Sequence, residues 1–258
     1  MAGRRARRAR PPAPRSQHFL RSGVLAAEFV ASANLPRDEV VVEFGAGTGR
    51  LTAELARVST RVIAVELDSS LAARLRGRWA HVEVVEGDAA ELELPNEPFA
   101  VVSNLPFHRT TELLHHLLDN PLTPLRRADL IVEWAVAHKH AVPWPSSVNG
   151  VLWGARYEAS VTRRLSRQAF APPPSVDAGV LVFRRRSSPL VQPSLAAEYH
   201  RFVASGFRHG LRSVVSRREL EQIGAVATTG RELDAHQWAT LFRRRARTEL
   251  SGRRRSSR

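Results

Sequence analysis

Short β-branched runs alternate with helical patterns through the first half of the chain, and this alternation limits the fold more than any other feature. Strands are predicted at residues 40–44, 61–66, 82–85, 99–102 and 128–132. Helices are predicted at residues 22–33, 51–58, 69–78 and 110–118. Strands and helices in this order predict the α/β class with a doubly wound parallel sheet. In such sheets ligands bind beyond the carboxyl ends of the strands.

The second half of the chain has a different pattern. Residues 158–165 and 178–183 indicate two strands around the Pro-rich segment 171–174, which predicts an antiparallel hairpin at one edge of the sheet. The pattern becomes helical from about Leu195, after a Ser-Ser-Pro linker. The predicted units are an α/β domain over residues 16–187 and a small all-α domain over residues 188–245.

Positive charge is concentrated at the two ends of the chain. Lys and Arg total 39 against 25 Asp and Glu, a formal net charge of +14. Residues 1–15 contain six arginines and no acid, and residues 243–258 contain eight arginines and one Glu. These segments lack apolar content, so we predict disordered basic tails at residues 1–15 and 246–258. The tails favour a partner with a phosphate backbone, although a GC-rich genome also produces an Arg-rich chain with a single lysine.

The composition excludes several classes of protein. The chain has no cysteine, which rules out a disulfide scaffold, a thiolate nucleophile and a Cys-ligated metal. No carboxylate is spaced to complete a metal site with the paired histidines, so no metal is expected. No apolar run approaches roughly 18 residues, and the Arg-rich start does not look like a signal peptide. We therefore expect no membrane partner and a cytoplasmic location.

Glycine or polar residues stand at four successive strand ends, namely Gly45–Gly49, Glu66, Asp88 and Asn104. The glycine loop allows the backbone to approach a ligand closely, but Arg50 replaces the third glycine of a dinucleotide fingerprint, which disfavours NAD. Glu66 lies 19 residues after Gly47, a spacing suited to a carboxylate that accepts hydrogen bonds from ribose hydroxyls. Asp88 is suited either to accept from an adenine amino group or to cap the helical turn that follows it.

The segment Asn104-Leu105-Pro106-Phe107 is the most informative in the chain. Pro106 restricts the backbone so that the Asn104 side-chain oxygen and the Leu105 carbonyl can point the same way. An exocyclic amine offers two N–H groups to such a pair of acceptors, and Phe107 could stack on the base that carries it. The simpler alternative is an ordinary Asn-x-Pro turn.

Taken together, these motifs resemble one family. Glu43-Phe44-Gly45-Ala46-Gly47-Thr48-Gly49, Glu66, Gly87-Asp88 and Asn104–Phe107 match, in order, the motifs of S-adenosylmethionine-dependent rRNA adenine-N6 methyltransferases. Ser16–Leu20 is similar to their N-terminal motif, and Phe170–Asp177 to their F-x-P-x-P-x-V segment. The likeness is closer to the Erm enzymes, which methylate one adenine of 23S rRNA and confer resistance to macrolides, lincosamides and streptogramin B. Segments around Tyr199 and Trp238 resemble the helical domain of actinobacterial members.

The resemblance implies a Rossmann-like methyltransferase that uses S-adenosylmethionine, acts on 23S rRNA and works as a monomer. It assigns the target adenine to Asn104, Leu105, Pro106 and Phe107, with Phe170 on the other face of the base. The residues implied to bind the cofactor are His18, Leu20, Gly45, Ala46, Gly47, Glu66, Leu67, Asp88, Ala89 and Asn104.

Two positions depart from the patterns of this superfamily. Family members usually carry Asn where His18 stands. Glu133-Trp134-Ala135-Val136 differs from the Q-x-E-V-like pattern of the sister group, which methylates paired adenines of small-subunit rRNA. That sister activity is one alternative. A non-catalytic nucleic-acid-binding protein on the same scaffold is another.

Overall fold

The computed structural model describes residues 18–141 and 147–256. In this part of the chain, a seven-stranded sheet has the order β4-β3-β2-β5-β6-β9-β7, and β1 pairs with β8 in a separate two-stranded sheet. The strands are β1 (Phe19–Leu20), β2 (Val40–Phe44), β3 (Arg61–Glu66), β4 (Val82–Glu86), β5 (Phe99–Asn104), β6 (Leu125–Glu133), β7 (Tyr157–Leu165), β8 (Phe170–Ala171) and β9 (Ala178–Arg185).

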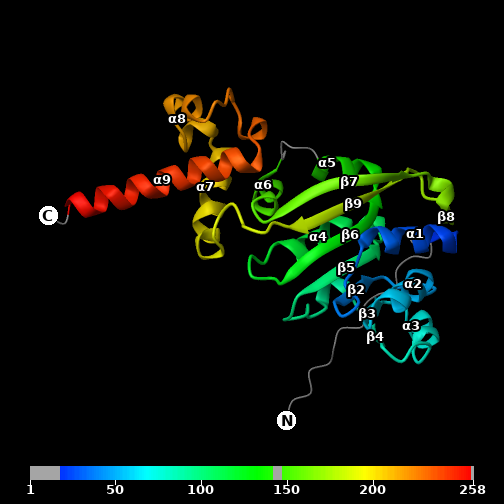
Figure 1. The fold of residues 1–258 in the computed structure, drawn as a ribbon. Helices are drawn as coiled ribbons and strands as arrows, with labels where there is room; N and C mark the ends of the chain where they lie inside the picture. The colour runs from blue at the N-terminus through cyan, green and yellow to red at the C-terminus, as the bar shows by residue number, and fades with distance from the viewer. Residues whose placement is uncertain (1–17, 142–146, 257–258) are drawn as a thin grey trace, which may run out of the picture.

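The helices connect these strands and then form the C-terminal region (Figure 1). The α-helices are α1 (Gly23–Ala33), α2 (Arg50–Val58), α3 (Ser69–Leu75), α4 (Thr110–Leu118), α5 (Trp134–Ala141), α6 (Val148–Gly154), α7 (Ala196–Arg208), α8 (Arg217–Gln222) and α9 (Ala235–Ser256). The 3₁₀ turns are η1 (Ala89–Glu91), η2 (Phe107–Arg109), η3 (Arg167–Ala169), η4 (Pro193–Leu195), η5 (Leu211–Ser213) and η6 (Gly230–Glu232). No helix in the described ranges is long and apolar enough to cross a membrane.

The sheet confirms the predicted fold class. Strands β2 to β6 are parallel to one another, whereas β9 is antiparallel to both β6 and β7. The predicted edge hairpin is therefore present, with its second strand inserted next to β6. Because the strands are parallel, the carboxyl ends of β2, β3, β4 and β5 lie along one edge of the sheet.

Helices cover both faces of the sheet, as the alternating side chains of the strands require. Val41 and Ile131 face the layer that contains α1 and α2. Val40 and Leu130 face the opposite layer, which contains α4 and α5. These are fully or almost fully buried positions, and they explain why the strands read as continuous apolar runs in the sequence.

Several boundaries differ from the sequence-based expectation, and two of them shape the segments around the site. Strand β5 continues to Asn104, so this residue is the last of the strand rather than part of the following loop. Helix α3 ends at Leu75, because Gly77 has a φ of +73°, which lies in the left-handed region and cannot continue a helix.

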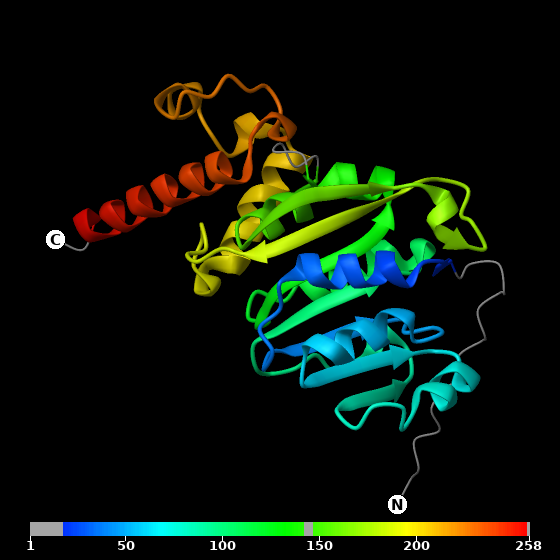
Figure 2. The same ribbon diagram turned by 45° about the vertical axis from the view of Figure 1, so that its right-hand side comes forward.

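A second apolar core lies among the C-terminal helices, around Trp238. It also takes in Val151 of α6, a helix that precedes the expected boundary at residue 188. Helices α7, α8 and α9 gather beyond one end of the sheet, and α9 projects away from the body (Figures 1 and 2).

Helix α9 differs from the expectation of a disordered tail beginning at residue 246, because it continues to Ser256. Its start is fixed by the buried Trp238, and once a helix is nucleated, Ala, Leu, Arg and Glu propagate it readily. The tail predicted at residues 1–15, and Ser16 and Gln17 of the N-terminal motif, lie outside the described residues.

Candidate active site

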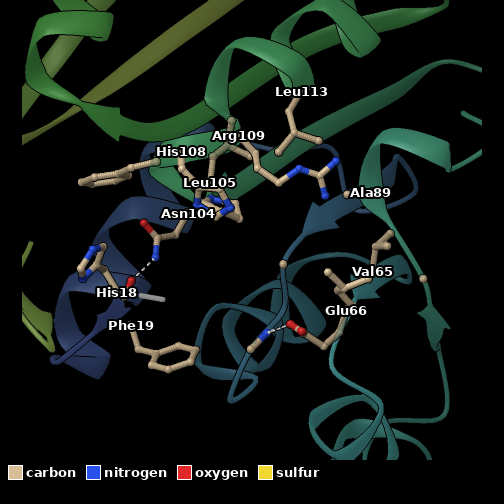
Figure 3. Close-up of a pocket in the computed structure, with 16 residues that line it drawn as sticks. His18, Phe19, Val65, Glu66, Ala89, Asn104, Leu105, His108, Arg109 and Leu113 are labelled. Carbon is tan, nitrogen blue, oxygen red and sulfur yellow. Dashed lines mark hydrogen bonds between the residues drawn. The ribbon is translucent and has the colours of Figure 1, made fainter. Parts of the chain in front are cut away.

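A cavity lies at the carboxyl ends of the parallel strands, with about 800 Å³ of empty space when the part open to solvent is counted. Figure 3 shows that its walls come from the loops after β2, β3, β4 and β5 and from the N-terminal segment. Its lining residues are His18, Phe19, Gly45, Gly47, Val65, Glu66, Leu67, Gly87, Ala89, Asn104, Leu105, Pro106, Phe107, His108, Arg109 and Leu113.

The loop after β2 is tied to the end of β3. Glu66 is buried, and its Oε2 accepts a hydrogen bond of 2.6 Å from the Gly47 amide. Its Oε1 accepts from the Asp68 amide at 2.9 Å. Each carboxylate oxygen keeps a further lone pair, so the carboxylate can still accept from hydroxyl groups in the cavity.

Gly47 is required in this loop for two separate reasons. Its φ of +56° lies in the left-handed region, which L side chains rarely adopt. A Cβ atom there would also lie only 2.6 Å from Cε1 of Phe19. The close approach of the N-terminal segment to this loop therefore requires glycine at position 47.

The orientation of the Asn104 amide is fixed by the N-terminal segment. Its Nδ2 donates to the backbone carbonyl of His18 at 2.7 Å (Figure 3). Its Oδ1 is buried and has no hydrogen-bond partner among the described residues. A buried acceptor without a partner is costly, so this atom is available to a donor on a ligand.

Three rings lie together beside Asn104. The Phe107 ring is partly exposed and lies 5.6 Å from the His18 ring and 6.1 Å from the Phe170 ring. His18 is held in place because its Nδ1 donates to the Pro172 carbonyl at 2.9 Å. Phe170 is fully buried and meets Phe107 edge to face, so in this conformation it supports the Phe107 ring and presents no free face of its own.

Asp88 follows β4 and caps the turn η1. Its Oδ1 accepts from the Ala90 amide at 2.9 Å and from Nη1 of Arg109 at 2.7 Å. Partial burial acts to raise the pKa of Asp88, but the hydrogen bonds from Arg109 and Ala90 outweigh it, and the pKa is lowered from 3.8. Asp88 therefore caps the helical turn that follows it, as one of the two sequence-based predictions states. Its second carboxylate oxygen takes part in neither of these hydrogen bonds.

Glu43 lies in the buried part of β2 behind the glycine loop. Its Oε2 accepts from the Thr52 hydroxyl of α2 at 2.6 Å. Burial raises the pKa of Glu43 from 4.5 to about 8, although the Thr52 hydrogen bond opposes this rise and the nearby Glu66 adds to it. Glu43 thus joins strand to helix below the cavity.

Most of the residues predicted from the sequence meet in the cavity. Those among its lining residues are His18, Gly45, Gly47, Glu66, Leu67, Ala89, Asn104, Leu105, Pro106 and Phe107. Four others lie behind or beside the lining: Leu20, Ala46 and Phe170, which are buried, and Asp88, whose carboxylate contacts Arg109.

Sequence reasoning missed Phe19 and Arg109 as individual site residues. Phe19 belongs to the N-terminal motif, so its position was a usable signal. Arg109 pairs with a residue 21 positions away, and nothing in the local pattern indicates that contact. Among the described residues, no three His, Cys, Asp or Glu side chains lie together in a way that could hold a metal ion.

This sheet, with an acid at the end of β3, another after β4 and an Asn-Leu-Pro-Phe segment at the end of β5, defines an S-adenosylmethionine-dependent methyltransferase. The profile of the family described as ribosomal RNA adenine dimethylase matches residues 14–224, which is most of the chain. The chain belongs to this family and is an rRNA adenine-N6 methyltransferase.

Individual relatives support the assignment. The chain is 34% identical over 218 residues to the mycinamicin-resistance protein MyrB of Micromonospora griseorubida, covering 79% of this chain and 69% of that protein. It is 35% identical over 211 residues to ribosomal RNA small subunit methyltransferase A of Streptomyces coelicolor, covering 77% of this chain and 73% of that protein. The crystal structure of 23S rRNA methyltransferase ErmE matches with a TM-score of 0.77 and 28% identity, over 88% of this chain and 98% of that chain.

The residues of the cavity fit the cofactor of this family. The Glu66 carboxylate retains acceptor capacity for hydroxyl groups, and Asp88, beside the lining, keeps one carboxylate oxygen outside its hydrogen bonds to Ala90 and Arg109. At Asn104, the unpartnered Oδ1 marks the place where a polar ligand group completes the site. The backbone of the glycine loop, without side chains at Gly45 and Gly47, lets a ligand lie directly against it.

Proposed function

We propose that the protein methylates N6 of an adenine in 23S rRNA and thereby confers resistance to macrolides, lincosamides and streptogramin B. The similarity to ErmE, which extends over 98% of that chain, and to a mycinamicin-resistance protein supports this substrate. So does the segment Glu133–Val136, which departs from the pattern of the small-subunit enzymes.

The observation that carries the chemistry is the orientation of the Asn104 amide. Because Nδ2 is occupied by the His18 carbonyl, the amide presents its oxygen as the free group. That oxygen can accept a hydrogen bond from an N–H donor such as the exocyclic amine of adenine. An amide is no base near neutral pH, so Asn104 orients the amine and localises its lone pair without removing a proton.

S-adenosylmethionine, when bound, would supply a methyl group on a positively charged sulfur; as the amine nitrogen takes the methyl group, the S–C bond would break and its electron pair would return to sulfur. The protein contributes position: Asn104 and the Leu105 carbonyl hold the amine, and Phe107 stacks on the base. The proton leaves the nitrogen after the methyl group has been accepted. Effects of proximity and alignment supply at most about 7–11 kcal/mol of the reduction in barrier, and each stacked base contributes about 1–3 kcal/mol to binding.

The cofactor is assigned to the strand ends. Glu66 accepts from the ribose hydroxyls, Asp88 from the adenine amine, and Gly45 and Gly47 admit the cofactor close to the backbone. Ala46 and Leu20, which are buried beneath this surface, act through the backbone and packing. A stacking role for Phe170 remains a prediction, since its ring is covered in this structure.

Methylation of small-subunit rRNA is the second candidate, because the small-subunit enzyme of Streptomyces coelicolor is as similar in sequence as the resistance protein is. The two candidates are separated by mass spectrometry of rRNA fragments from cells that express the wild type or Asn104→Ala, which also detects single and double methylation.

A new methyl group on one 23S adenine, absent with Asn104→Ala and accompanied by macrolide resistance, is the expected result. Methylation of paired small-subunit adenines would establish the second candidate. RNA binding with no methyl transfer to any rRNA would refute both and favour a non-catalytic nucleic-acid-binding protein.

A further inference from the structure

Arg109 links two carboxylates at the edge of the cavity. It is the last residue of η2, two residues after Phe107. Nη1 donates to Oδ1 of Asp88 at 2.7 Å, and Nε donates to Oε2 of Glu112 at 2.8 Å. In Figure 3 the Arg109 side chain reaches from η2 toward Ala89, the residue that follows Asp88. The hydrogen bonds that join Glu112 to Arg109 and Arg109 to Asp88 thus connect α4 to the loop after β4.

This ion pair differs from the surface pairs of the same protein. The side chains of Arg109 and Asp88 are 21% and 23% exposed, whereas those of Arg76 and Glu86 are 48% and 41% exposed. Exposed pairs of the second kind contribute little to stability, since water and salt screen them. Arg109 also lines the cavity, so its guanidinium is placed to affect what binds there.

Only one of the two oxygens of the Asp88 carboxylate accepts hydrogen bonds from the described residues. Oδ1 accepts from both the Ala90 amide and Arg109, while no hydrogen bond to Oδ2 occurs among the described residues. Two donors on one oxygen fix the rotation of the carboxylate group. If Arg109 were absent, only the Ala90 amide would hold it.

We propose that Arg109 is a positioning residue for recognition of the cofactor: it holds the Asp88 carboxylate so that the second oxygen stays available to the amino group of adenine. This rests on the proposed role of Asp88 in binding that amino group. Discrimination between an adenine and a hypoxanthine ring then depends on Arg109, because hypoxanthine has an acceptor in place of the amine, and a carboxylate cannot pair with it.

The test is the ratio of dissociation constants for S-inosylhomocysteine and S-adenosylhomocysteine, measured by titration calorimetry on the full chain. The wild type should prefer the adenosyl compound by about 10- to 100-fold, the range for one hydrogen bond to a charged group. Arg109→Leu should bring the ratio close to 1, because it should weaken binding of the adenosyl compound and leave binding of the inosyl compound nearly unchanged. Arg109→Gln, which keeps a polar side chain without the charge, serves the same purpose if the leucine variant does not fold.

Two further variants distinguish a failure of the proposed Arg109 role from a failure of the proposed Asp88 role. Arg76→Leu removes an arginine from an exposed carboxylate pair outside the cavity and should leave the ratio unchanged. Asp88→Asn should abolish the preference. If Asp88→Asn does so while both Arg109 variants keep the wild-type ratio, the role of Asp88 stands and the inference about Arg109 is overturned. A wild-type ratio near 1 would overturn both.

Discussion

Replacing Glu43 by Gln should stabilise the protein increasingly as the pH rises. The carboxyl is buried in β2, and burial raises its pKa to about 8 from an ordinary value of 4.5. Between these two values the native protein keeps a proton on Glu43 that the unfolded chain has lost. The free energy of unfolding therefore falls as the pH rises through this window, and the loss is complete above a pH of about 8.

The size of the effect follows from the width of that window. One proton contributes about 1.4 kcal/mol for each pH unit between the two pKa values, which limits the total penalty to about 5 kcal/mol. Gln has nearly the same shape as Glu and can still accept the hydrogen bond of Thr52, but it does not ionise. The stability of Glu43→Gln relative to the wild type should therefore increase with pH by up to about 1.4 kcal/mol per unit, and level off above a pH of about 8.

Urea unfolding at several pH values from below 6 to above 8 measures this difference directly. Glu28→Gln is the matched control, because the Glu28 side chain is 52% exposed on α1 and its replacement should give a difference that changes little with pH. A difference between wild type and Glu43→Gln that stays constant across the range would show that Glu43 ionises as an exposed carboxyl does, and the argument from burial would be wrong.

Three other outcomes are expected. Phe107→Ala should lower kcat/KM on rRNA fragments more than Phe107→Tyr, by the loss of a stacking contact of about 1–3 kcal/mol; full activity of the alanine variant would rule out stacking. Gly47→Ala should weaken cofactor binding in calorimetry because the new Cβ meets Phe19, whereas Gly77→Ala, with a φ of +73° but no atom within 4 Å of its Cβ, should cost only the backbone strain of about 1–2 kcal/mol and leave binding intact; equal effects on binding would contradict the close-contact argument. Deleting residues 1–15 and 246–258 should weaken RNA binding and flatten its dependence on salt, and an unchanged salt slope would show that these residues do not contact phosphates.

The succession of strands along the chain and the positions of the strand-end residues could be predicted from the sequence, because both depend on local patterns. Buried β-branched runs mark the parallel strands, and Gly45, Glu66 and Asn104 stand where those runs stop. A parallel sheet then places their ends along one edge without further information. The convergence of these residues in one cavity follows from topology alone.

The rest of the site depends on contacts between distant segments, which local patterns do not contain. The pairing of β1 with β8 joins residues about 150 positions apart and brings Phe170 behind Phe107. In this structure the Phe170 ring is buried against Phe107, so its predicted stacking on the substrate depends on an arrangement that no local pattern indicates. Arg109 looks like an ordinary polar residue until the fold places it against Asp88.

The small sheet of β1 and β8 also imposes an order on the appearance of activity during synthesis. The His18 carbonyl that orients Asn104 belongs to a segment secured by Phe170 and Ala171, which are translated long after both. A growing chain that ends before β8 has the glycine loop and Asn104. It lacks the strand that pairs with β1, so the His18 carbonyl is not yet secured against the Asn104 amide. A chain that ends before β8 therefore lacks a finished pocket, and activity is expected only after β8 has been added.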